Sequence, residues 1–73
     1  MDATIIHVME SWPLQLALLT PAGQEHVALD ENARIHRAGV LVDPAALQPG
    51  QRVKVLMLST GGDRTVIEVE IFD

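Results

Sequence analysis

A Pro-Gly turn at residues 49–50 runs directly into an alternating stretch at residues 51–59, and this feature constrains the fold more than any other. Successive side chains of an extended chain point to opposite faces, so Val53 and Val55 share one face and the basic residues between them share the other. A turn that feeds such a pattern predicts a half-buried β-strand. The chain around it must therefore supply further strands to pair with.

Turn residues divide the rest of the chain into extended runs of similar length. Pro13, Pro21 and Gly39 interrupt segments rich in β-branched and aliphatic residues, which predicts short strands joined by tight turns. Asp43 suits a helix N-cap and Pro44 suits the first helical position, so one short helical turn is predicted there. The predicted strands are residues 3–10, 14–20, 25–37 with a polar bend at 30–32, 51–59 and 64–72, with Gly61-Gly62 as the loop of the last hairpin.

Five strands with one short helical turn between the third and the fourth follow the order of an OB-type barrel. We therefore predict an all-β fold, a five-stranded OB-like small barrel, formed as a single domain by residues 1–73. A domain of this length buries only about 60% of its unfolded surface. Because the chain has no Cys, disulfides cannot supplement the core, and stability must come from apolar packing, which self-association could extend.

The charge balance argues against a nucleic-acid binder. Ten acidic and five basic side chains give a formal net charge of −5, whereas phosphate binding favours a basic surface. Trp12 and Phe72 are the only aromatics in the sequence, too few for a platform on which bases stack. No apolar run reaches the ~20 residues of a membrane helix, and no signal peptide is recognisable, so we expect a cytoplasmic protein with no membrane partner. The sequence leaves open the alternative that the chain is a domain of a longer, exported protein.

The stretch Leu47-Gln48-Pro49-Gly50-Gln51-Arg52-Val53-Lys54-Val55 carries an L-x-x-G-x-x-V-x-V signature. With the segment 27–35 and Gly39 before it, the chain resembles an uncharacterised bacterial family of small OB-like β-barrel domains, known as a domain of unknown function. The chain departs from that pattern at Gln51, where the family often has Asp, and at Ala33, where it often has Thr. The resemblance implies a barrel fold and brings no catalytic residues with it.

Candidate polar sites have a chemical and a structural interpretation. His7, His26 and His36 are potential metal ligands, but they fall on three separate strand segments without close spacing. Asp30, Glu31 and Asp43 could bind calcium, although a turn and a helix cap explain them locally. Glu68 and Glu70 could act as an acid/base pair, but cross-strand ion pairs with Arg52 and Lys54 account for the same alternation. We predict no catalytic residue, no metal, no cofactor and no enzymatic activity.

The surplus of apolar residues points to a protein–protein interface. If Ile6, Val8 and Ile67 fill the core with the valines of the later strands, strict alternation leaves other apolar side chains outside. A large exposed apolar patch marks an interaction site, and a homo-oligomer is the simplest case. The alternative is that twist and bulges tuck most of these residues into one core. The predicted interface residues are Ile5, Met9, Leu19, Leu56, Leu58, Val66 and Phe72.

The leading hypothesis is therefore a non-enzymatic structural or interaction module that binds a second copy of itself or another protein domain. The alternative hypothesis is OB-type binding of a small ligand or single-stranded nucleic acid. Basic side chains would line that ligand face. The predicted residues are Arg34, Arg37, Arg52 and Lys54.

Overall fold

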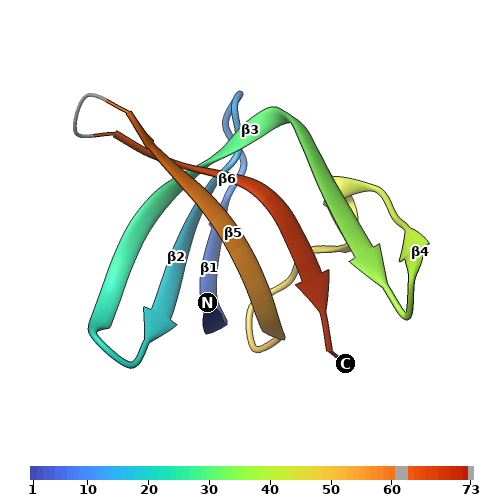
Figure 1. The fold of residues 1–73 in the computed structure, drawn as a ribbon, viewed down its shortest axis with the longest axis horizontal. Coiled ribbons are helices and arrows are strands. Elements are labelled where there is room, and N and C mark those ends of the chain that lie inside the picture. The colour runs from blue at the N-terminus through green and yellow to red at the C-terminus, as the bar shows by residue number, and fades with distance from the viewer. Residues whose placement is uncertain (61–62, 73) are drawn as a thin grey trace.

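The computed structural model describes residues 1–60 and 63–72, so the predicted hairpin loop Gly61-Gly62 lies outside the described residues. Strands dominate the chain, as Figure 1 shows, and the five long ones begin and end within two residues of the predicted limits. No helical segment in these described ranges has the length and apolar character needed to span a bilayer. The elements are β1 (Asp2–Met9), β2 (Gln15–Thr20), β3 (Gly23–Arg37), β4 (Val40–Leu41), the 3-10 helical turn η1 (Pro44–Ala46), β5 (Arg52–Thr60) and β6 (Asp63–Ile71).

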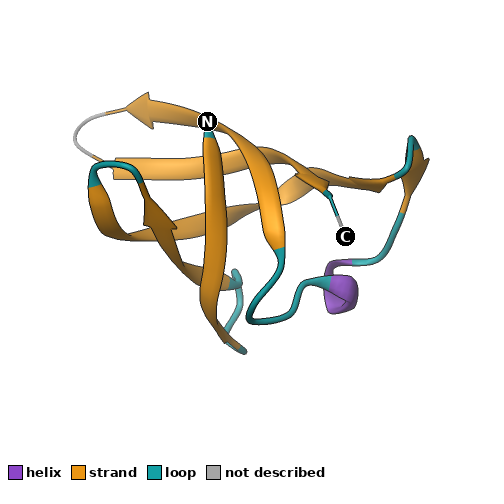
Figure 2. Cartoon of the chain, turned by 90° about the horizontal axis from the view of Figure 1, so that it is seen from below, coloured by secondary structure: helices purple, strands orange, loops and turns teal. Residues whose placement is uncertain are grey.

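The strands close into a barrel. Neighbours follow the order β2-β1-β5-β6-β3, and a further pairing between β2 and β3 joins the two ends. All pairings in this ring are antiparallel except the one between β3 and β6, which is parallel. The short strand β4 adds to the end of β3, and Figure 2 shows η1 on the loop between β4 and β5. The predicted all-β barrel of five strands, with one helical turn between the third and fourth, is confirmed.

The barrel interior is filled almost entirely by aliphatic side chains. Leu16, Leu18, Val53, Val66 and Val69 are each at most 1% exposed. Burying aliphatic surface contributes roughly 25 cal/mol per Å², which makes this interior the main source of stability. The buried core comprises Ala3, Ile5, Leu16, Leu18, Val27, Leu29, Ile35, Leu47, Val53, Val55, Val66, Val69 and Ile71.

A bulge in β1 changes which side chains enter that core. Ile5 pairs with Leu18 and His7 pairs with Ala17, so Ile6 is an additional residue in β1. One extra residue shifts the alternation by one position, and side chains before the bulge take the opposite face from the one that strict alternation assigns. The predicted placement of Ile6 in the core and Ile5 outside is therefore wrong, since Ile5 is 1% exposed and Ile6 is 40% exposed.

A second bulge lies in β6. Leu56 pairs with Glu68 and Met57 pairs with Val66, which leaves Ile67 as the additional residue. Val66 is fully buried, so its predicted place on the outer face is wrong, and Ile67 is half-buried instead of lying in the core. Both errors have the same physical cause, because a bulge reverses the inside and outside faces along one strand.

The turn before β5 depends on a glycine backbone. Gly50 has φ of +92°, and its N–H donates to the Ile5 carbonyl oxygen at 2.7 Å, which ties the turn to β1. A Cβ built at Gly50 meets no atom within 4 Å, so a side chain there fits sterically and only the backbone conformation opposes it. The turn thus needs glycine for its positive φ.

We expect Gly50→Ala to lower the free energy of unfolding by about 1–2 kcal/mol, because an L-residue is strained at this φ. Urea unfolding followed by far-UV circular dichroism measures the change. Gln48→Ala is the control, since Gln48 is exposed in the same loop and is not among the residues with a positive φ. Equal stability of Gly50→Ala and the parent chain would contradict the strain at this position.

Candidate functional site: the open edge of β5

The strand β5 is longer than its ladder with β1. It pairs with β6 from Val53 to Thr60, but with β1 only from Arg52 to Lys54. One more backbone pair follows, in which Val55 N–H donates to the Met1 carbonyl at 2.9 Å and the Met1 ammonium donates to the Val55 carbonyl at 3.0 Å. Among the described residues, no strand pairs with β5 on this side beyond that point. We call the side of β5 that faces away from β6, from Leu56 to Thr60, the open edge.

The side chains of this segment are apolar and exposed. Leu56 is 54% exposed and Leu58 is 53% exposed, and as alternate residues they stand on the same outer face. No charged residue and no Pro occurs between Val55 and Thr60. Natural proteins protect edge strands with Lys, Pro, bulges or inward-pointing charges, because an unprotected edge pairs readily with another chain. The open edge has no Lys, Pro or charged side chain, and the bulge of the β5–β6 ladder opposite Leu56 and Met57 is the one such device present in the described part of the edge.

The direction of the backbone groups follows from the last pair with Met1. Val55 directs both its N–H and its carbonyl toward β1. In an antiparallel strand these groups alternate from one side to the other with each residue. Met57 and Ser59 therefore present their N–H and carbonyl groups at the open edge, while those of Leu56 and Leu58 are directed toward β6. The open edge offers two residues that can pair with an incoming strand.

The other predicted interface residues do not share this setting. Leu19 is 51% exposed but lies on β2, which is paired on both sides, and Phe72 is 53% exposed just after β6 ends. Met9 is half-buried, and Ile5 and Val66 belong to the core. Sequence reasoning also left out exposed apolar side chains in turns and in β4. These are Trp12 at 74%, Val40 at 62% and Leu41 at 64%.

The predicted basic ligand face is interleaved with carboxylates. Lys54 stands opposite Glu70 on one side and opposite Asp2 on the other, and Arg34 stands opposite Glu68. Such rows place opposite charges side by side, which neutralises the field that a phosphate chain would need. The predicted cross-strand neighbour of Lys54 on β6 is thus present in the register.

The predicted pairing of Arg52 with Glu68 or Glu70 stays a prediction, because the register does not place Arg52 directly opposite either residue. Arg52 pairs in the ladder with Thr4 and accepts a backbone hydrogen bond from Phe72 at 2.9 Å, so it stands beyond Glu68 and Glu70 in the register. The offset arises because Val53 pairs with Ile71, so that Arg52, the first residue of β5, lies opposite Phe72, two residues past Glu70. Arg37 pairs with Val40 and Ile71 at the far end of β3.

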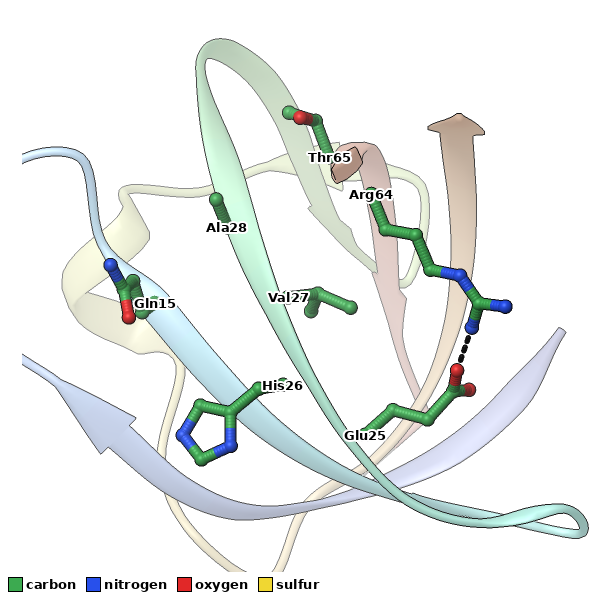
Figure 3. A pocket seen from close by; sticks show the side chains of 7 residues that line it. All are labelled: Gln15, Glu25, His26, Val27, Ala28, Arg64 and Thr65. Carbon is green, nitrogen blue, oxygen red and sulfur yellow. Dashed lines mark ion pairs between the residues drawn. The ribbon is translucent and has the colours of Figure 1, made fainter. Parts of the chain in front are cut away.

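A polar groove lies elsewhere on the barrel, between β3 and the start of β6. Its volume is about 600 Å³, and Figure 3 shows Glu25 and Arg64 directed toward each other across it, joined by an ion pair. The groove exists because β6 pairs with β3 only from Ala28 onward. Sequence reasoning missed this pair, since a parallel contact between distant strands leaves no local signal. The lining residues are Gln15, Glu25, His26, Val27, Ala28, Arg64 and Thr65.

The candidate metal ligands have local explanations or stand apart. His7 and His26 flank Ala17 in neighbouring strands, and His36 lies near the opposite end of β3. The Asp30 carboxylate accepts the Asn32 N–H at 2.9 Å. Within the part of the chain that the structure describes, no three His, Cys, Asp or Glu residues are grouped so that they could hold a metal ion.

The candidate calcium ligand Asp43 performs the role of a helix cap. Its carboxylate accepts the Ala45 N–H at 2.8 Å, and Pro44 follows it in the first turn of η1, as predicted. A carboxylate at this position satisfies a backbone donor that the helical turn leaves unpaired.

Comparison with protein-family models, with curated proteins and with solved structures finds no match to this chain. The resemblance to the small bacterial barrel domains therefore stays a prediction.

Proposed function

We propose that the domain is a non-enzymatic interaction module of the cytoplasm that binds a second copy of itself through the open edge of β5. One observation carries the proposal: β5 continues past its ladder with β1 as an uncharged strand with two leucines more than half exposed. Contiguous exposed apolar surface and an unprotected strand edge both mark surfaces that associate with other chains.

Charge restricts where a second copy could bind. Each copy has a net charge of −5, so most pairs of faces would bring like charges together. The segment from Val55 to Thr60 is neutral, and two such segments meet without a charged side chain between them. Association there also covers apolar surface for a small domain whose own core has little margin.

The test is the sedimentation behaviour of the chain over a range of concentrations. We expect the parent chain to dimerise and Leu56→Glu to weaken the dimer at least tenfold, because a charge must be desolvated next to Glu68. Leu19→Glu is the matched control, since Leu19 is 51% exposed on a strand paired on both sides.

A parent chain that sediments as a monomer at high micromolar concentration would contradict the proposal. Equal weakening by Leu19→Glu and Leu56→Glu would place the contact elsewhere on the barrel.

The second candidate is OB-type binding of a small polar ligand in the groove that holds the Glu25–Arg64 pair. A groove of about 600 Å³ falls within the usual range of ligand sites, ~300–1,000 Å³. Glu25 and Arg64 offer an acceptor and a donor on opposite walls of it. A thermal-shift screen with saccharides and nucleotides at low salt tests this candidate. If no compound raises the midpoint temperature of unfolding, ligand binding in this groove is contradicted.

A further inference from the structure

We infer that two copies associate by antiparallel addition of β5 to β5, with Leu58 on the two-fold axis. This inference rests on the proposed self-association and specifies how it occurs. The alternative geometry is packing of the leucine-bearing outer faces, in which no backbone hydrogen bonds form between the copies. The two geometries make different demands on the backbone of β5, so they can be separated by experiment.

The positions of the available backbone groups determine the register. Met57 and Ser59 are the residues that present N–H and carbonyl groups at the open edge, given the alternation that starts from Val55. In a two-fold antiparallel pair, Met57 of each copy then exchanges hydrogen bonds with Ser59 of the other. The N–H and carbonyl groups of Met57 and Ser59 are then all paired in both copies, as a two-fold symmetric interface requires.

Neighbouring registers form fewer backbone hydrogen bonds. A shift that places Met57 opposite Met57 would leave Ser59 opposite Val55, whose backbone groups Met1 already occupies, so that only the central pair could form. A shift that places Ser59 opposite Ser59 would extend the pairing beyond Thr60, where β5 ends. A shift by a single residue would place at the interface the groups of Leu56 and Leu58 that are directed toward β6.

The resulting register places Leu58 opposite itself as a non-hydrogen-bonded pair. The Cα atoms of such a pair are about 4.5 Å apart, closer than in a hydrogen-bonded pair, so the two leucine side chains come into contact on the axis. Leu56 falls opposite Thr60 of the second copy. Lys54 lies outside the paired segment, and no like charges face each other within it.

Single-cysteine variants test the register, because the chain has no Cys of its own. We expect Leu58→Cys to form an intermolecular disulfide readily under mild oxidation, since a Cα separation of about 4.5 Å lies within the range that a disulfide spans, ~4.4–6.8 Å. Leu56→Cys is the control of equal exposure. Its two copies would lie about 13 Å apart along the strands, at ~3.3 Å per residue, and should remain unlinked. Non-reducing gel electrophoresis measures the dimer fraction.

A proline variant tests the backbone hydrogen bonds. Ser59→Pro removes an N–H that is directed at the open edge, a position where an edge strand tolerates Pro. The dimer loses two hydrogen bonds by symmetry, so we expect its dissociation constant to rise by roughly tenfold or more. Ser59→Ala keeps the N–H and should leave the constant unchanged. Circular dichroism confirms that both variants keep the barrel.

The outcomes separate this inference from the function on which it rests. A monomeric parent chain overturns both. A dimer that Leu56→Glu weakens, but that Ser59→Pro leaves intact and Leu58→Cys does not link, supports self-association and overturns strand addition. Preferential linking of Leu56→Cys over Leu58→Cys overturns the register.

Discussion

Leu18→Ala is expected to lower the free energy of unfolding by about 2–5 kcal/mol, the largest stability effect that we predict for a single truncation in this chain. Leu18 is 0% exposed and lies in the core cluster, so its removal leaves a cavity that surrounding strands cannot fill without moving. Small domains have only about 5–15 kcal/mol of stability in total. The variant should therefore unfold at a much lower urea concentration than the parent chain.

The neighbouring residue provides the control. Leu19 has the same side chain on the same strand but is 51% exposed, and Leu19→Ala should change the free energy of unfolding by no more than about 0.5 kcal/mol. Both variants are compared with the parent chain at one protein concentration, because self-association adds a concentration-dependent contribution. Equal losses for Leu18→Ala and Leu19→Ala would contradict the assignment of inner and outer faces in β2.

Gln51→Ala is expected to cost about 2 kcal/mol, because one buried side chain satisfies two backbone groups of the preceding loop. The Gln51 Oε1 atom accepts the Gln48 N–H at 2.8 Å, and its Nε2 group donates to the Ala46 carbonyl at 2.9 Å. The side chain is 9% exposed, so little water can replace these bonds when it is removed. Thermal unfolding followed by circular dichroism measures the loss.

Two variants show whether those bonds are responsible. Gln48→Ala removes an exposed side chain but keeps the N–H that Gln51 accepts, and it should be nearly neutral. Gln51→Glu keeps the acceptor but loses the donor to Ala46, and its stability should fall below that of the parent chain. A stability of Gln51→Glu equal to that of the parent would show that the bond to Ala46 contributes nothing.

Local patterns predicted most of the barrel. The Pro and Gly turns, the Asp43 cap with Pro44 and the alternation in β5 each depend on residues close in sequence. Turn chemistry and strand period are properties of such short windows, which is why the strand limits could be predicted to within two residues.

The errors arose where distant pairing decides the outcome. The additional residues Ile6 and Ile67 have no distinctive sequence, and only the register with the neighbouring strand identifies them as bulges. The same holds for the Glu25–Arg64 pair, which depends on how far β6 follows β3.

The candidate site was predicted in part. Alternation alone predicts Leu56 and Leu58 as interface residues, and both are exposed. Alternation cannot show that β5 extends past its ladder with β1, because the length of a ladder also depends on the partner strand. The open edge is therefore defined by comparing the two ladders of β5, which differ in length.

The contact between Met1 and Val55 also bears on the order of folding. The first residue of the chain completes a strand pair with a partner 54 positions away. The β1-β2-β3 meander and the β5–β6 hairpin can each form from neighbours in sequence, whereas closing the barrel requires the ends of both units to meet. During synthesis, the side of β1 that pairs with β5 remains unpaired until β5 has been synthesised. We therefore expect closure to be a late and slow step, before which one side of β1 is exposed to other molecules.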